Sequence, residues 1–381
     1  MNPFKFGKEV SGYQFYDRIE SSLQIYRTLR DGSSNVVLYA PRRYGKTSLV
    51  LKVLKDFKRD GVKCLYFDIS KVMSIERFCV DYAAAVYGLW GGFPEIVNKV
   101  RAYLVHLHPT ISFDDGLVPQ ISFDYGERMN SLALSEILDL TEKLAAEAGD
   151  KTVVVAFDEF QDVGGLSKSI PLEAVFRSVI QSHVRVRYVF LGSKTHLMQR
   201  MFGSRSRPFY HSAQTVKIGK PPIDESREFV VSRFAAEGIE IGEPQVERML
   251  ELSENIPYFL QAIASLTYQQ VEGRGEKRVE IGDVEAAVGL LVDGNEDYYE
   301  EIVRNLADAQ FPLVDALARE PTGRFDEKYR SRYRLGGLST IHSSVRGLMR
   351  KGVVDSVKGV YRIADPFFAR YLQRRRPTGN L

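Results

Sequence analysis

The chain has 381 residues, with 52 Lys or Arg and 49 Asp or Glu, so its formal net charge is only +3. At roughly 100–200 residues per domain, this length suggests two or three domains, each able to form a core without disulfides or structural metals. Hydrophobic residues make up 44% of the chain and charged residues 27%, which excludes a disordered or collagen-like chain.

Over the first 220 residues, short apolar runs alternate with segments of helical periodicity. We expect helices at 16–29, 47–54, 74–107, 132–148 and 171–181, and strands at 35–40, 62–68, 152–158, 187–192 and 213–218. This alternation is typical of an α/β fold, a parallel sheet with helices on both faces. The sequence Ile-Ser-Phe-Asp occurs at 111–114 and again at 121–124, which predicts a β-hairpin inserted at one edge near 109–127.

The pattern changes after Lys220-Pro221-Pro222, because only helical periods occur from about 223 to 310. Beyond that point we expect helices at 311–319, 338–351 and 366–374, with two short β-rich runs at 353–357 and 360–363. The predicted organisation is therefore a core at 1–221, a helical domain at 222–310, a third domain at 311–376 and a tail at 377–381.

Two further features bear on location. The sequence holds no run of about 18 apolar residues, the length of a membrane helix, and its N-terminus has no apolar signal core. Cys64 and Cys79 are the two cysteines, and we expect both to be reduced and buried. These features predict a cytoplasmic protein with no membrane partner.

The segment 40–47 fits the phosphate-binding loop pattern G-x-x-x-x-G-K-[S/T], except that Ala40 replaces the first glycine. In such a loop, backbone N–H groups meet phosphate oxygens at a helix N-terminus. Lys46 would reach the β- and γ-phosphates, and Thr47 would place its hydroxyl on Mg²⁺. The residues predicted to bind the nucleotide are Ala40, Pro41, Arg42, Arg43, Tyr44, Gly45, Lys46, Thr47 and Ser48. Ala40 is harmless if its φ is negative and costs about 1 kcal/mol or more if it is positive.

Polar residues at two other strand ends complete the predicted site. Asp158 and Glu159 follow the most apolar strand, as in a Walker B segment, so Asp158 would hold Mg²⁺ and Glu159 would orient or deprotonate the attacking water. Ser193 is the first candidate to contact the γ-phosphate or this water and Thr195 the second, with an ordinary strand-end turn as the alternative. The sequence has no Asn-Lys-x-Asp guanine signature, so ATP is favoured over GTP.

The chain resembles the archaeal-type ATPase family, in the STAND group of AAA+-like P-loop ATPases. The specific matches are Pro-Arg-Arg-x-Gly-Lys-Thr-Ser at 41–48 and Asp-Glu-Phe-Gln at 158–161. Weaker matches occur at 2–4, 15–18, 191–193, 256–258 and 365–368. The resemblance implies a five-stranded ATPase core, a helical lid and a C-terminal winged helix-turn-helix domain. It also implies that Phe15 and Arg18 help to enclose adenine, that Pro257 comes near the nucleotide, and that ATP-dependent oligomers form.

The chain also departs from the family pattern. Asn255 stands where the family often has Gly, and Asn tolerates the left-handed conformation best among the other residues. The family tends to have a basic residue before the fifth strand, where this chain has His211, with Arg205 and Arg207 nearby. The arginine that would stabilise charge during hydrolysis is therefore left open. Arg42 and Arg43 are other candidates, with solvation or pairing to acids as the alternative.

The net charge is unevenly distributed along the chain. Residues 311–381 hold 15 basic and 6 acidic residues, a balance of +9, whereas residues 1–310 hold 37 and 43, a balance of −6. In the expected helix at 338–351, a buried face is predicted for Leu338, Ile341, Val345, Leu348 and Met349. An exposed face is predicted for Thr340, Ser343, Ser344, Arg346 and Arg350. Lys358 and Gly359 would form the tip of the wing.

The sequence thus predicts a Mg²⁺-dependent ATPase that binds ATP and ADP and repositions a basic winged helix. The partner of residues 311–376 is left open between double-stranded DNA and a protein, because winged helices bind both. Two other functions remain alternatives. One is a DNA-binding protein in which ATP is regulatory, and the other is a nucleotide-bound scaffold with slow or negligible hydrolysis.

Overall fold

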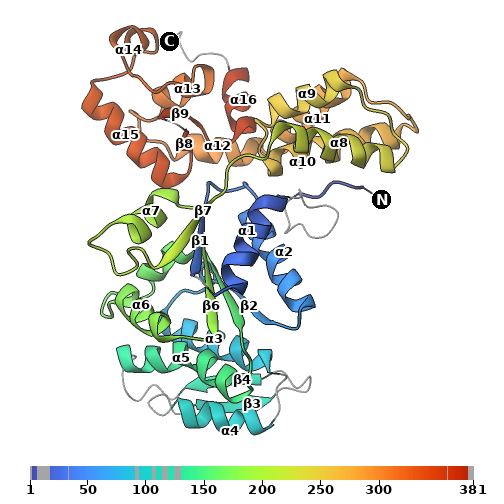
Figure 1. Ribbon diagram of the computed structural model, residues 1–381. Helices are drawn as coiled ribbons and strands as arrows, with labels where there is room; N and C mark the ends of the chain where they lie inside the picture. The colour runs from blue at the N-terminus through green and yellow to red at the C-terminus, as the bar shows by residue number, and fades with distance from the viewer. Residues whose placement is uncertain are drawn as a thin grey trace. The chain divides into compact units, whose positions relative to one another are not determined.

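The computed structural model describes residues 2–6, 18–32, 34–90, 94–104, 109–113, 119–123, 130–357 and 359–375. Phe15, Lys358 and the predicted tail at 377–381 lie outside these residues. The chain divides into two compact units, of which one is Ser11–Gly219. The other combines Met1–Val10 with Lys220–Leu381 (Figure 1). Each unit is described by itself.

The unit Ser11–Gly219 is built on a five-stranded sheet in the order β2-β5-β6-β1-β7. Its strands are β1 Asn35–Tyr39, β2 Lys63–Asp68, β5 Val153–Asp158, β6 Val186–Gly192 and β7 Ala213–Lys217. All four neighbouring pairs are parallel. The predicted α/β fold with a five-stranded parallel sheet is therefore confirmed. In this order β6 lies between β5 and β1, so the carboxyl ends of these three strands meet at one edge.

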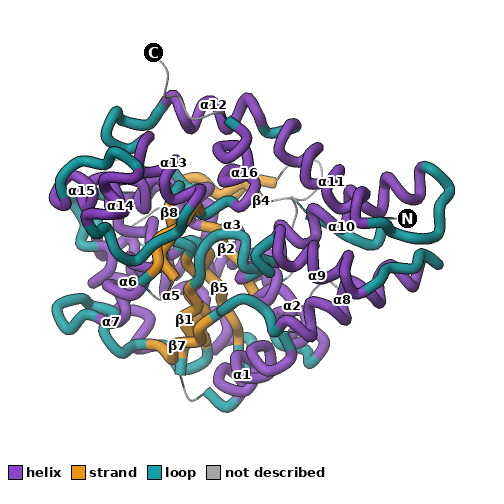
Figure 2. Tube along the Cα trace, turned by 90° about the horizontal axis from the view of Figure 1, so that it is seen from above, coloured by secondary structure: helices purple, strands orange, loops and turns teal. Residues whose placement is uncertain are grey.

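Helices cover both faces of this sheet. They are α1 Ile19–Arg30, α2 Lys46–Arg59, α3 Ile75–Leu89, α4 Pro94–Tyr103, α5 Ser131–Glu147, α6 Leu172–Ser182 and α7 Thr195–Gly203. Two short 3₁₀ helices, η2 Ile69–Lys71 and η3 Phe160–Gly165, follow β2 and β5. Helices α1 and α2 lie on one side of the strands and α5 and α6 on the other (Figures 1 and 2). The single helical stretch expected at 74–107 is two helices, α3 and α4.

The predicted hairpin is present, but it does not extend the main sheet. Strands β3 Pro109–Phe113 and β4 Pro119–Phe123 pair only with each other, antiparallel, with Ile111 opposite Ile121. Strand β4 contacts helix α3. The hairpin is therefore a separate two-stranded sheet that packs on a helix.

Strand β5 passes through the centre of the core, and all six of its residues are buried. Phe157 lies among other buried aromatic rings, and its ring centroid is 6.0 Å from that of Tyr188 and 5.6 Å from that of Tyr82. Close packing of such rings leaves little room for movement. The end of β5, where Asp158 and Glu159 follow Phe157, is therefore rigidly held.

The other unit contains five consecutive helices followed by a smaller α/β arrangement. The five are α8 Ile223–Ala236, α9 Glu243–Leu252, α10 Pro257–Gly273, α11 Ile281–Asp293 and α12 Glu296–Arg304. Residues 2–6, grouped with the core by the sequence prediction, belong to this unit. Asn2 donates to the backbone and side chain of Ser265, and Phe4 packs on Phe229 and Phe234. The boundary expected between residues 310 and 311 stays a prediction.

The rest of this unit has the elements of a winged helix. They are α13 Phe311–Arg319, α14 Glu327–Arg332, α15 Leu338–Lys351, β8 Val354–Val357, β9 Val360–Ile363 and α16 Pro366–Arg374. Strands β8 and β9 form the antiparallel wing, and Thr322 forms an isolated antiparallel bridge with Tyr361 of β9. Gly359, with a φ of 84°, stands at the wing turn, as a left-handed position requires.

The burial of α15 differs from the prediction at three residues, one of which is Met349, expected to be buried but only half-buried. Leu338 is 47% exposed, whereas Ser344 is buried and its hydroxyl donates to the carbonyl of Ala309. The buried stripe is Ile341, Ser344, Val345 and Leu348, which follows the i, i+3, i+4, i+7 spacing of one helix face. Leu338 is exposed because α15 begins there, and the preceding Gly336 and Gly337 have no side chains to cover it.

Two remaining expectations concern membranes and cysteines. Within the described ranges, no helix has both the length and the apolar character needed to cross a membrane. Cys64 and Cys79 are both buried free thiols, as predicted. Burial raises the pKa of the Cys64 thiol to about 12, so it stays protonated at neutral pH.

Candidate functional site

The loop between β1 and α2 has the conformation of a phosphate-binding turn. Gly45, the residue before α2, has a φ of 79°, and Arg43 is also left-handed with a φ of 71°. Ala40 is not among the residues with positive φ, so the alanine that replaces the usual glycine costs no backbone strain. Gly45, the residue that precedes α2, makes no side-chain capping hydrogen bond. The N-terminus of α2 is therefore a place where backbone N–H groups can bind a phosphate.

Lys46 is folded back onto this loop and is only 6% exposed. Its Nζ donates to the carbonyl oxygens of Ala40, at 2.9 Å, and Pro41, at 3.0 Å. Burial lowers the pKa of Lys46 to about 8, although the nearby carboxylates of Glu159 and Asp158 partly oppose this shift. A bound phosphate would give this ammonium group a negatively charged hydrogen-bond partner in place of two neutral carbonyl oxygens.

Asp158 lies against the start of α2, as the sequence predicted for a metal-binding pair. Its Oδ2 accepts hydrogen bonds from Thr47 Oγ1 and from Tyr66 Oη, each at 2.7 Å. Its Oδ1 accepts from the backbone N–H of Glu159 at 2.8 Å. Tyr66 was missed by the sequence analysis, because only the pairing of β2 with β5 brings it beside Asp158.

These oxygen donors fit a magnesium ion. Mg²⁺ is usually held by one or two protein oxygens together with phosphate oxygens and waters. Thr47 Oγ1 and the carboxylate of Asp158 are such donors and already lie within hydrogen-bond distance of each other. In the described ranges no group of three or more His, Cys, Asp or Glu forms a metal cluster, so the phosphates would have to complete this coordination.

Glu159 is held by the residue that follows strand β6 and by a residue of η3. Its Oε2 accepts from Ser193 Oγ at 2.7 Å, from the Ser193 backbone N–H at 3.2 Å, and from Gln161 Nε2 at 2.5 Å. Burial alone would raise the pKa of Glu159, but these hydrogen bonds and the charge of Lys46 outweigh it, so the pKa is lowered. Glu159 is therefore ionised at neutral pH. Of the two candidates at this strand end, Ser193 contacts Glu159, whereas Thr195 begins helix α7.

The predicted arginines are distributed as follows. Arg18 is buried and donates from Nη2 to the carbonyl of Tyr44 at 2.9 Å, so it supports the phosphate-binding loop. Arg42 and Arg43 have exposed side chains. Arg207 is paired with Glu173, whereas Arg205 and His211 are exposed.

Two predicted residues belong to the helical unit. Pro257 is the first residue of α10 and is buried. Asn255, two residues earlier, is left-handed with a φ of 53°, and its Nδ2 donates to the carbonyl of Pro221 at 2.8 Å. Asn255 therefore has the left-handed conformation that Asn tolerates best among the residues other than glycine.

Comparisons with known proteins agree with this architecture. Residues 297–374 match a family model described as "probable winged helix domain". The structure of a Walker-type ATPase of Pyrococcus abyssi is similar over 97% of this chain and 99% of that chain, with a TM-score of 0.68 and 18% identity. The ORC2 protein of Aeropyrum pernix, in ADPNP–ADP complexes, is similar over 94% of this chain and 92% of its own, with a TM-score of 0.55 and 15% identity.

A third structure is the Aeropyrum pernix ORC1 protein in complex with DNA, which covers 96% of this chain and 93% of its own. Its TM-score is 0.51 and its identity 15%. A search of curated proteins found no match to the sequence. The chain therefore has the fold of a Walker-type P-loop ATPase. Its C-terminal part is a winged helix, as the resemblance to archaeal-type ATPases implied.

Proposed function

We propose that this protein binds ATP with Mg²⁺ and hydrolyses it, and that the nucleotide state repositions the winged helix. One observation supports this above all. Hydrogen bonds join Thr47 to Asp158, Asp158 to the backbone of Glu159, and Glu159 to Ser193, although these residues come from separate strand ends. Lys46 interacts electrostatically with both carboxylates. Such a network suits phosphoryl transfer, in which positioning and charge stabilisation supply most of the catalysis.

Each residue has a distinct role in this proposal. The loop N–H groups and Lys46 bind the phosphates, and Lys46 exchanges its carbonyl partners for phosphate oxygens. Thr47 and Asp158 hold Mg²⁺, which neutralises charge on the phosphates when bound. Glu159, ionised at neutral pH, takes a proton from the attacking water, and Ser193 keeps the carboxylate in place.

The rate of hydrolysis depends on an arginine that stabilises charge, which can contribute about 10³–10⁵-fold. Arg42 and Arg43 are the candidates within the loop, because their side chains are exposed beside the phosphate position. If no arginine acts in this way, the protein works as a nucleotide-bound scaffold with slow turnover.

Replacing Lys46 tests the proposal. Lys46→Ala should weaken ATP binding by about 100-fold or more, because it removes the one buried cation of the loop. Lys52→Ala is the matched control, since Lys52 lies on the same helix but is partly exposed and paired with Asp56. ATP affinity and phosphate release are measured for both variants and the wild type. Unchanged nucleotide binding in Lys46→Ala would refute the proposal, and binding without turnover in the wild type would favour the scaffold.

A second candidate function is DNA binding by the winged helix. On α15, the side chains of Thr340, Ser343, Arg346 and Arg350 are exposed. Within the described residues, Arg346 and Arg350 have no acidic partner, which is the state in which cations bind phosphates. A helix that exposes Ser, Thr and Arg side chains can lie in the major groove of DNA, where these side chains contact base edges and phosphates.

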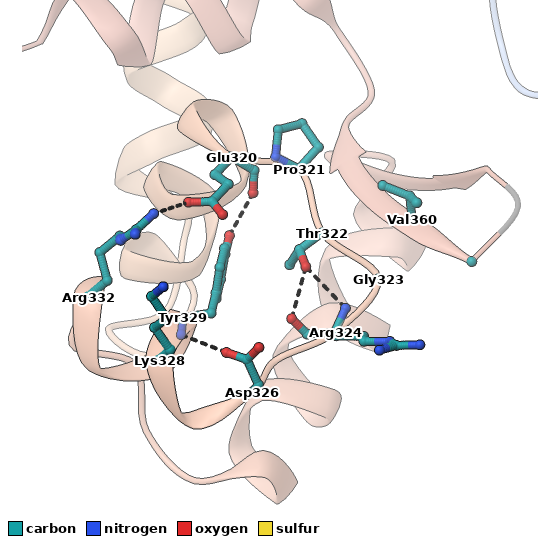
Figure 3. A pocket seen from close by; sticks show the side chains of 11 residues that line it. Glu320, Pro321, Thr322, Gly323, Arg324, Asp326, Lys328, Tyr329, Arg332 and Val360 are labelled. Atoms are coloured by element: carbon teal, nitrogen blue, oxygen red, sulfur yellow. Dashed lines mark hydrogen bonds and ion pairs between the residues drawn. The ribbon is translucent and has the colours of Figure 1, made fainter.

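A polar cavity of about 630 Å³ beside the wing adds to this surface. Its acidic residues are already engaged, because the Glu320 carboxylate accepts from Arg332 and from the Tyr333 hydroxyl, and Asp326 caps α14. Figure 3 shows Arg324 and Lys328 lining the same cavity with no interaction drawn to either side chain. The cavity therefore presents cations near the wing turn.

A salt titration tests this second function. Duplex DNA is bound by the full-length chain over a range of salt concentrations. We expect log K to fall steeply and linearly with log[salt], because each phosphate contact releases a counterion. A flat dependence would reject DNA and favour a protein partner for the winged helix.

A further inference from the structure

One oxygen of Glu159 carries every hydrogen bond that this carboxylate accepts from the described residues. Oε2 receives Gln161 Nε2 at 2.5 Å, Ser193 Oγ at 2.7 Å and the Ser193 N–H at 3.2 Å. Oε1 receives none of them. The two oxygens are therefore inequivalent, with Oε2 restrained by three donors and Oε1 left to react.

The orientation of Gln161 follows from this contact. A carboxylate only accepts hydrogen bonds, so the amide must turn its NH₂ group toward Glu159. The amide oxygen then faces the opposite way, where it is buried and has no hydrogen-bond partner within the described chain. Gln161 itself is 7% exposed. A buried acceptor without a partner costs free energy, so this orientation is unfavourable in itself.

Two further features of the backbone accommodate this glutamine. A Cβ atom at Gly192 would lie 2.5 Å from the Gln161 Oε1 and 2.3 Å from the Met198 Cγ, so a larger residue there would force these side chains to move. Glu159 is left-handed, with a φ of 50°, which is unfavourable for a residue with a side chain. Two costly features, the amide oxygen of Gln161 without a partner and the left-handed backbone of Glu159, thus lie at one carboxylate, and such costs typically persist at functional sites.

We propose that Gln161 is a positioning residue that, together with Ser193, restrains Oε2 of Glu159 so that Oε1 is the proton acceptor during hydrolysis. The proposal rests on the ATPase function inferred above. In the step, a water oxygen bonds to the terminal phosphorus and its proton passes to Glu159 Oε1. The bond from that phosphorus to the bridging oxygen breaks, and its electron pair leaves with ADP.

The variant Gln161→Met separates positioning from a merely structural role. Methionine has nearly the same length and volume but no donor, and it also removes the buried amide oxygen that lacks a partner. We expect kcat to fall about 10- to 100-fold, with ATP affinity unchanged within about twofold. The melting temperature should be equal or higher. A merely structural role predicts the reverse, a lower melting temperature with turnover per folded molecule unchanged.

Gln245 provides a matched control in the helical unit. It is also a buried glutamine whose Oε1 has no partner among the described residues, and it faces a glycine, since a Cβ at Gly242 would lie 2.7 Å from that oxygen. Gln245→Met should resemble Gln161→Met in stability but keep wild-type turnover.

A double-mutant cycle with Ser193→Ala completes the test. If Gln161 and Ser193 restrain the same oxygen, kcat of the double variant falls by less than the product of the two single reductions.

A second variant serves if Gln161→Met does not fold. Gln161→Asn keeps an amide but shortens its reach, and the same loss of kcat is expected. If the wild type hydrolyses ATP and the Gln161 variants do so with the same kcat, this inference alone is overturned. Absence of hydrolysis by the wild type would overturn the ATPase function and this inference together.

Discussion

The charged side chains at the strand ends of the ATPase core differ from those on the surface of the winged helix in whether the protein supplies their partners. At the strand ends, Lys46 and Asp158 form hydrogen bonds to other groups of the protein. Lys46 donates to two loop carbonyls, and Asp158 accepts from Thr47, Tyr66 and the backbone. On the winged helix, Arg346 and Arg350 extend from α15 with no acidic partner among the described residues.

This difference corresponds to two kinds of ligand recognition. A preorganised buried network binds one small ligand in one geometry, because its dipoles are fixed before the ligand arrives. Unpaired surface cations bind an extended polyanion, and their strength depends on salt. The net charge of +3 conceals this contrast, because a balance of −6 over residues 1–310 is combined with +9 over residues 311–381.

The largest effect that should separate the two regions is expected from Glu159→Gln. The substitution keeps the size and the Ser193 contact but removes the proton acceptor, so kcat should fall by about 10²–10⁴-fold. ATP affinity and DNA binding should stay as in the wild type. Single-turnover phosphate release and equilibrium nucleotide binding measure this, and near-normal turnover would assign the proton transfer to another group.

A smaller effect, confined to the winged helix, is expected from Arg346→Ala and Arg350→Ala. Each should lower the slope of log K against log[salt] by about one for DNA, because one phosphate contact is lost. ATP turnover should not change. Arg374→Ala is the control, since Arg374 is also exposed but paired with Asp293 at 2.9 Å. If Arg374→Ala lowered this slope as much as the α15 substitutions do, α15 would not be the DNA-binding surface.

The smallest effect is expected at Leu338, an exposed residue of α15, and a buried residue of the same helix provides the contrast. Leu338→Ala should change the free energy of unfolding by less than about 0.5 kcal/mol, because Leu338 is largely exposed. Leu348→Ala, at a fully buried position of the same helix, should cost about 2–5 kcal/mol. Urea denaturation of the full-length variants measures both. A large loss for Leu338→Ala would mean that it is covered by a partner in solution.

Much of the candidate site could be predicted because its signals are local. The loop around Lys46 is one continuous motif, and Asp158, Glu159 and Ser193 each follow an apolar strand directly. Carboxyl ends of parallel strands gather at one edge, so residues placed there are expected to meet.

The residues that were missed depend on contacts between segments distant in sequence. Tyr66 has no motif of its own and reaches Asp158 only because β2 pairs with β5. Arg18 was expected to help enclose adenine, but its hydrogen bond to the carbonyl of Tyr44, 26 residues away in the chain, was not predicted. The exposure of Leu338 was mispredicted because periodicity assigns a helix face but does not show what covers the first turn of the helix.

The amino-acid sequence by itself determined the alternation of strands and helices, the phosphate-binding loop and the acidic residues at the strand ends. It also determined the basic character of the C-terminal part. Only the tertiary structure decided the strand order β2-β5-β6-β1-β7, the negative φ of Ala40 and the three donors that converge on Glu159 Oε2. The physical reason is that periodicity and motifs depend on neighbours along the chain. Strand order and side-chain contacts depend on how distant segments pack into one core.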